Sequence, residues 1–209
     1  MDVSHPIRVI TPTLDAPVLE VLARTTQPLT GREVFRLARG GSDRGVRLVL
    51  RRLVRQGVVL ADEHAGSTLY VANRLHLAWP AIEALVGLRA SFLDQLRAQL
   101  RGWSIEPVHA SLFGSAARGD GDAESDIDLL LVHSDGTDEG RWGAQLEGLR
   151  DWVVTGTGNA PLVFDVTRSR FAEYVAAADP LVTEWRRDGI HLGGLPIETL
   201  IRSSRRKPA

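Results

Sequence analysis

The sequence predicts an α+β protein of two modules joined by a long helix, and three observations lead to this prediction. Residues 15–55 carry apolar residues at helical spacing, and two short strand-forming runs follow at 58–60 and 68–71. Residues 77–101 have the pattern of one long amphipathic helix. Residues 109–132 read as two apolar strands around a Gly-Ser turn and an acidic loop. The predicted domain boundaries are therefore 1–76, 77–102, 103–195 and, for a basic C-terminal tail, 196–209.

Capping residues mark the helices of the first module. After a helix over 15–24, Thr30 and Glu33 have the spacing of a capping box and open a helix that ends before Gly40. Ser42 caps a third helix, whose apolar face repeats at steps of three and four: Val46, Val49, Leu50 and Leu53. The two short strands then form a hairpin around a turn at 65–67.

Five arginines follow the other side of the third helix, against the single acid Asp43: Arg44, Arg47, Arg51, Arg52 and Arg55. Basic charge gathered on one face is the electrostatic footprint of nucleic-acid binding. The alternative is an ordinary solvated helix face, and Asp62 and Glu63 argue against a hairpin deep in a groove. Three helices and a hairpin resemble the winged helix-turn-helix domains of bacterial regulators. That resemblance implies binding of DNA or RNA through the third helix.

The predicted long helix has apolar residues along one side from Ile82 to Leu100, with Pro80 in its first turn, where proline is tolerated. Such a stripe normally packs within its own chain. It could also pair with a second copy, and winged-helix regulators generally act as dimers, so a homodimer stays open at this point.

The second module places two carboxylates where strands are usually apolar. Side chains at i and i+2 in a strand share a face, so Asp126 and Asp128 point the same way while Ile127 points the other. Like charges held this close raise each other's pKa. A divalent cation between them makes the arrangement favourable, because Mg²⁺ is usually held by one or two carboxylates together with substrate phosphates. The pattern predicts Mg²⁺ and a phosphorylated ligand together.

The turn before these carboxylates predicts the phosphate site. Residues 109–113 read as a strand, and Gly114-Ser115 turns the chain into a helix that begins near Ala116. Exposed backbone N–H groups at a helix start bind anions, and glycine lets a ligand approach closely. The Ser115 hydroxyl adds a donor, and Arg118 adds a positive charge in the first turn. Arg118 could equally pair with one of the loop acids that follow it.

The run from Gly114 to Val132, GSAARGDGDAESDIDLLLV, resembles the signature of the DNA polymerase beta-like nucleotidyltransferase superfamily, and most closely its minimal nucleotidyltransferase branch. The resemblance implies a mixed sheet with flanking helices. It also implies that Gly114 and Ser115 hold the phosphates of a nucleoside triphosphate and that Asp126 and Asp128 bind metal. A third family carboxylate comes from a later strand, and the matching position is Asp165 within 161–166. With it, two Mg²⁺ ions would serve transfer of a nucleoside monophosphate to an acceptor hydroxyl.

The resemblance leaves the acceptor open: a protein side chain, a transfer RNA end or a small molecule. Because the minimal branch often belongs to toxin–antitoxin pairs, a partner protein is the first expectation. A different class of function is a transcription regulator whose nucleotidyltransferase domain only senses a nucleotide. Transfer of label from a nucleoside triphosphate would separate the two.

Composition agrees with an intracellular protein. The 209 residues include no cysteine, which excludes disulfides and thiolate metal sites and leaves oxygen ligands as the natural metal chemistry. The net charge is −1, so a nucleic-acid surface has to be local. No apolar run approaches the roughly 20 residues of a membrane span, and no signal peptide pattern is present. We expect a cytoplasmic protein without a membrane partner.

Overall fold

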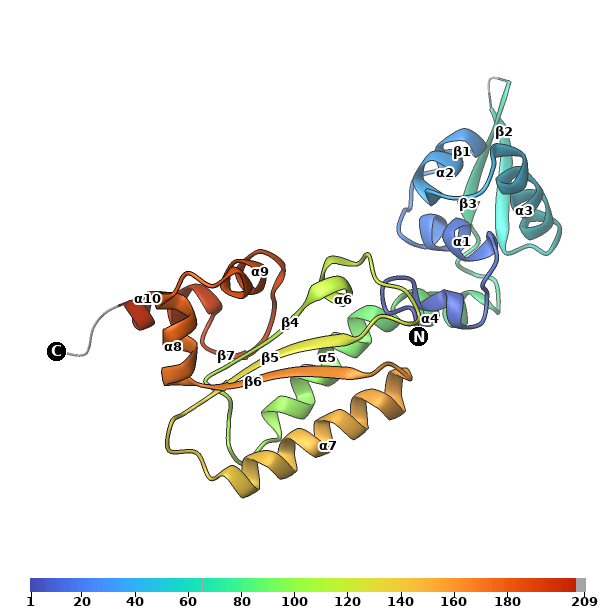
Figure 1. Cartoon of the computed structure of the whole chain (residues 1–209). Coiled ribbons are helices and arrows are strands. Elements are labelled where there is room, and N and C mark those ends of the chain that lie inside the picture. Colours follow the sequence, from blue (N-terminus) through green and yellow to red (C-terminus); the bar gives the residue numbers. More distant parts are fainter. Residues whose placement is uncertain (65, 206–209) are drawn as a thin grey trace. The chain divides into compact units, whose positions relative to one another are not determined.

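The computed structural model describes residues 1–64 and 66–205, and the chain divides into two compact units (Figure 1). The N-terminal unit consists of His5–Arg89. The sheet unit combines Met1–Ser4 with the chain from Ala90 onward. The segment 77–102, predicted as a separate linker, is therefore shared between the two units.

The N-terminal unit has three helices followed by a hairpin, in the predicted order. Thr30 caps its helix through a complete capping box with Glu33, and the Ser42 side chain accepts from the Gly45 N–H at the start of the next helix. A short strand that the sequence pattern did not predict pairs with the hairpin and completes an antiparallel sheet of order β1-β3-β2. Of the predicted turn at 65–67, residue 65 lies outside the described residues. The elements are η1 (Pro6–Val9), α1 (Asp15–Ala23), β1 (Leu29–Thr30), α2 (Gly31–Ala38), α3 (Asp43–Arg55), β2 (Val59–His64), β3 (Ser67–Ala72) and α4 (Trp79–Val86).

The predicted long helix is two helices, α4 and α5 (Leu88–Arg101), separated at Gly87. Their apolar side chains serve different cores. Ile82, Leu85 and Val86 pack against the core of the N-terminal unit, whereas Phe92, Leu96 and Leu100 are buried in the sheet unit. The stripe that could have paired with a second copy is thus used within the chain.

The sheet unit is built on a four-stranded mixed sheet of order β6-β5-β4-β7. β5 runs parallel to β6 and antiparallel to β4, and β7 pairs antiparallel with β4. The strand β7 was not predicted. The elements are β4 (His109–Phe113), α6 (Gly114–Arg118), β5 (Ile127–His133), α7 (Glu139–Thr157), β6 (Pro161–Thr167), α8 (Arg168–Ala176), α9 (Pro180–Asp188), β7 (Ile190–Gly194) and α10 (Ile197–Arg205).

The two faces of this sheet carry separate cores, as Figure 1 shows by the helices on either side. Along β5, Ile127, Leu129 and Leu131 pack toward α5 and α7. Leu130 and Val132 point to the other face and pack against α8, α9 and α10. This alternation is the two-residue period of a strand buried on both sides, and it decides which side chains of the strands can meet.

The basic C-terminal segment differs from its prediction. Residues 197–205 form α10, whose Leu200 and Ile201 are buried in the core around α8 and α9, so these residues are part of the fold and not a tail. The remainder of the predicted tail, 206–209, lies outside the described residues. Within the described residues, no helix is both long and apolar enough to cross a membrane.

Candidate nucleotide and metal site

The centre of the candidate site is a close approach between Gly114 and Asp128. In the β4–β5 ladder Phe113 lies opposite Asp128, so the next residue, Gly114, turns the chain directly over that carboxylate. Gly114 has a φ of +68°, and a Cβ on it would overlap with Asp128 Oδ2 and come within 2.9 Å of Cγ. Any other residue at this position would have a strained backbone conformation, and its Cβ would clash with Asp128. Glycine is therefore required here for both reasons.

Asp126 and Asp128 lie at the start of β5, with Asp126 exposed and Asp128 half-buried. Burial raises the pKa of Asp128 above its usual value, and the charge of Asp126 raises it further, against a smaller lowering effect of Arg118. The two carboxylates therefore interact unfavourably when both are ionised. A cation would relieve that repulsion, so this pair fits Mg²⁺, with phosphate oxygens supplying further ligands.

Ser115 faces the acidic loop that leads to Asp126. A Cβ on Gly121 would lie 3.0 Å from the Ser115 Oγ and 3.2 Å from the Ser125 Oγ, so the loop passes close over the Ser115 hydroxyl. The helix α6, which this residue opens with Gly114, has five residues. Gly114, Ser115, Asp126 and Asp128 are thus brought to one end of the β4–β5 pair.

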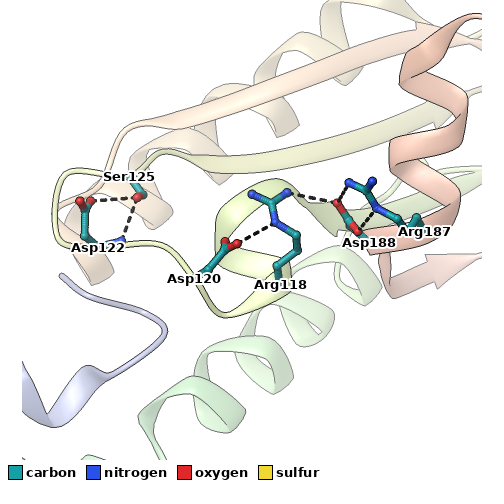
Figure 2. A network of polar contacts seen from close by, with 6 residues as sticks. All are labelled: Arg118, Asp120, Asp122, Ser125, Arg187 and Asp188. Atoms are coloured by element: carbon teal, nitrogen blue, oxygen red, sulfur yellow. Dashed lines mark hydrogen bonds and ion pairs between the residues drawn. The ribbon is translucent and has the colours of Figure 1, made fainter. Parts of the chain in front are cut away.

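Arg118 lies at the end of α6 and is engaged by two carboxylates (Figure 2). Its Nε donates to Asp120 at 3.0 Å and its Nη1 to Asp188 at 3.1 Å. Arg187 donates two further hydrogen bonds to Asp188, at 2.7 and 2.8 Å. Hydrogen bonds from Arg187 and Arg118 lower the pKa of Asp188 to about 2. Pairing with a loop acid, the alternative to phosphate binding, is what Arg118 does in this structure.

Asp165 does not join the other carboxylates, which corrects its predicted place in the metal site. In the parallel β5–β6 ladder it lies opposite Leu131, three positions beyond Asp128 and on the α7 face of the sheet. Its Oδ1 accepts from the Trp142 Nε1 at 2.9 Å and lies 3.8 Å from the His133 Nε2. Because side chains alternate along a strand, Asp128 and Asp165 point to opposite faces.

Within residues 1–64 and 66–205 no group of three His, Cys, Asp or Glu side chains is arranged to hold a metal ion. Of the three described carboxylates predicted to bind metal, Asp126 and Asp128 lie together, and Asp165 lies on the other face of the sheet.

The arginines of α3 fall into three groups. Arg44, Arg51 and Arg55 are exposed, and Arg47 is exposed but donates to Asp43 at 2.8 Å. A surface hollow of about 460 Å³ is lined by Asp43, Arg44, Arg47, Arg51 and Tyr70. Arg52 differs from its predicted place in this set: it is half-buried and forms an ion pair with Asp15 of α1.

Two residues near the site were not singled out from the sequence. Asp188 is the last residue of the amphipathic helix α9, and Asn159 stands in a Gly-Asn turn after α7, so neither belongs to a contiguous motif. They are identified by their closeness in space to the loop, and a single sequence does not give that closeness.

Comparison with known proteins gives a family match for part of the chain and two similar solved structures. Residues 93–178, less than half of the chain, match the family model described as "Nucleotidyltransferase domain". No curated protein matches. Among solved structures, a toxin–antitoxin crystallised with AMP-PNP is similar at 21% identity over 54% of this chain and 82% of that chain, with a TM-score of 0.38. A mutant of the toxin–antitoxin MntA-HpeT is similar at 18% identity over the same shares, also with a TM-score of 0.38.

Proposed function

We propose that this protein transfers a nucleoside monophosphate from a nucleoside triphosphate to an acceptor hydroxyl, with pyrophosphate as the other product. Residues 93–178 form a nucleotidyltransferase domain, which supports an enzyme of this class. The observation that carries the proposal is the packing of Gly114 against Asp128, because it joins the phosphate-binding turn to the carboxylate pair.

Four residues of the site have roles in this proposal. Asp126 and Asp128 would hold Mg²⁺, and Gly114 and Ser115 would contact the phosphates, since glycine exposes backbone and serine adds a hydroxyl donor. When bound, the metal supplies positive charge that offsets the charge of the triphosphate and of the leaving pyrophosphate. Burial and the nearby charge of Asp126 raise the pKa of Asp128, and a bound cation would offset the repulsion between the two carboxylates.

The proposal differs from the sequence-based expectations in the number of metal ions and in the homodimer. One Mg²⁺ is proposed in place of two, because Asp165 faces away from the pair. A homodimer through α4 and α5 is not part of the proposal, because their apolar side chains pack within the chain. The acceptor remains a protein, a transfer RNA or a small molecule. A partner protein of a toxin–antitoxin pair in the cytoplasm is the first candidate, by resemblance of the motif.

The test is transfer of label. The purified protein is incubated with each of the four α-³²P-labelled nucleoside triphosphates, Mg²⁺ and a cell lysate, in parallel with Asp126→Ala and Asp128→Ala. Labelled protein or RNA that needs both aspartates supports the proposal. Tight nucleotide binding with no label transferred to any acceptor supports the rival function, a regulator that senses a nucleotide.

A second function, nucleic-acid binding by the N-terminal unit, is favoured by the exposed Arg44, Arg51 and Arg55 along α3. The order of three helices and a hairpin is that of a winged helix-turn-helix domain, and we propose this identity for the unit. The hollow lined by Asp43, Arg44, Arg47, Arg51 and Tyr70 of β3 is a place where a phosphate backbone could approach. Binding of duplex DNA and of total RNA, measured over a range of salt concentrations, tests it.

A further inference from the structure

Asn159 braces the loop that leads into the carboxylate pair. Its side chain is buried, with 4% of the residue exposed, and its Nδ2 donates to two loop carbonyls, Ala123 O at 3.2 Å and Ser125 O at 2.8 Å. Two carbonyl acceptors require the NH₂ group at this position, so the orientation of the amide is determined. Both side-chain donors are therefore committed to the loop.

Asn159 is itself held firmly. Gly158, with a φ of +74°, ends α7 and turns the chain back, and the Asn159 N–H donates to the Thr157 Oγ1 at 3.1 Å. The Asn159 Oδ1 accepts from the Met1 amino group at 2.7 Å. One residue later, Ala160 O accepts from the Ile127 N–H at 2.8 Å, at the start of β5. These bonds hold the backbone around Asn159, and Met1 holds its side-chain oxygen.

The carbonyl that Asn159 holds belongs to the same peptide unit as the Asp126 N–H. That unit is planar, so fixing the Ser125 oxygen fixes the direction in which the chain enters Asp126. Asp128 is oriented by its place in the β4–β5 ladder, opposite Phe113. Asp126 is exposed and precedes the strand, so the ladder alone does not orient it.

We propose that Asn159 is the positioning residue that sets Asp126 beside Asp128, and through that sets the affinity of the pair for a divalent cation with a nucleoside triphosphate. The inference rests on the proposed function for its ligand, but not for its structural effect. Residues that support metal ligands without touching the metal typically contribute about 10-fold to 100-fold in metal affinity.

The first test needs neither metal nor nucleotide. Asn159→Asp keeps the shape of the side chain but turns its two donors into an acceptor facing two carbonyls. We expect faster amide hydrogen exchange over residues 122–128 of the metal-free protein, with exchange in β4 unchanged. Gln145→Ala is the matched control. Gln145 is a carboxamide of α7 whose hydrogen-bond partners, Ser104 and Ile105, lie outside this loop.

The second test measures function. By calorimetry with a non-hydrolysable nucleoside triphosphate, Asn159→Asp is expected to raise the Mg²⁺ concentration for half-maximal nucleotide binding by about 10-fold or more, whereas Gln145→Ala leaves it unchanged. If transfer is observed, saturating Mg²⁺ should restore most of kcat to Asn159→Asp, a rescue that general destabilisation would not give. If a folded Asn159→Asp variant shows the same hydrogen exchange and the same Mg²⁺ dependence as the wild-type protein, the inference is wrong.

The inference can still be tested if the variant does not fold or if the protein binds no nucleotide. If Asn159→Asp does not fold, the same measurements are made on Asn159→Ser. The inference is also overturned if residues 122–126 of the wild-type protein exchange their amide hydrogens as fast as the exposed turn 134–137. If the wild-type protein binds no nucleotide, the proposed function fails, while the exchange measurement on the metal-free protein still decides the role of Asn159.

Discussion

The backbone of Gly114 lies against the carboxylate of Asp128, leaving no room for a Cβ. Two segments that are separate in sequence, the Gly-Ser turn and the Asp-Ile-Asp strand, become one site through this contact. The contact also makes the site sensitive to a single methyl group.

Gly114→Ala should therefore destabilise the protein and abolish nucleotide binding. A left-handed backbone costs a non-glycine residue about 1–2 kcal/mol, and overpacking against Asp128 adds about 1–3 kcal/mol. Gly119→Ala is the control, because Gly119 has a φ of +81° but nothing within 4 Å of its Cβ position. Urea denaturation should show the larger loss for Gly114→Ala. Equal losses in the two variants would mean that the contact with Asp128 contributes nothing.

Asp128→Asn should stabilise the metal-free protein at neutral pH while removing Mg²⁺-dependent nucleotide binding. The folded-state pKa of Asp128 is raised, so its contribution to the free energy of unfolding is favourable at low pH and is lost as pH rises through that pKa. The gain at pH 7 should be below about 1 kcal/mol, because solvent screens a half-exposed pair. Thermal unfolding at pH 7 without metal measures it, and a lower melting temperature for Asp128→Asn contradicts the prediction. Asp122→Asn should show no gain, because hydrogen bonds from Ser125 and Glu124 lower the pKa of Asp122.

Substitutions of Asp165 separate a structural role from a metal-binding one. Asp165→Leu leaves the Trp142 indole N–H without its acceptor and should cost about 1–3 kcal/mol of stability. Asp165→Asn retains an acceptor oxygen and should keep both stability and Mg²⁺-dependent nucleotide binding. Loss of Mg²⁺ binding in a stable Asp165→Asn would return this carboxylate to the metal site.

Among the arginines of α3, exposed and paired positions should behave differently. If α3 contacts duplex DNA, each of Arg44→Ala and Arg51→Ala should make the salt dependence of binding shallower by about 0.9 per lost phosphate contact. Arg52→Ala breaks the ion pair with Asp15 and should lower stability by up to about 1 kcal/mol without changing the salt slope. Fluorescence anisotropy over 50–300 mM salt, about the range in which such slopes are resolved, measures this. A slope unaffected by both Arg44→Ala and Arg51→Ala would leave α3 as a solvated face.

His109 should make the protein less stable in mild acid. Burial lowers the pKa of His109 to about 4, its Nδ1 donates to Leu195 O at 2.7 Å, and its Nε2 is left to accept from the Ser111 hydroxyl at 3.0 Å. The unfolded state takes up the proton first, near pH 6.5. The free energy of unfolding should therefore fall as pH decreases from about 6.5 to about 4, by up to about 3 kcal/mol. Denaturation of wild type and His109→Gln over this range should show the larger fall in wild type.

The sequence pattern was most informative where chemistry and local structure coincide. Gly114, Ser115, Asp126 and Asp128 lie within 15 residues, so one turn and one strand fix their relation. For Asp165, the apolar strand was predicted correctly but the face of the sheet was not. A shift of one position in a strand moves a side chain to the other face. The division of the long helix at Gly87 was missed because both halves continue the same apolar period while packing on different cores. Asn159 carried no signal, because its partners are backbone carbonyls 34 and 36 residues away.

The assignment of Met1–Ser4 to the sheet unit affects how this protein can be dissected. Val3 is 4% exposed and packs in the same core as Leu96 and Leu129. A fragment that starts at Ala90 would therefore expose a gap in that core and would lack the contact of Met1 with Asn159. Domain truncations would then report defects of an incomplete core as if they were effects of losing the N-terminal unit. A faithful excision needs residues 1–4 rejoined to Ala90 through a flexible linker.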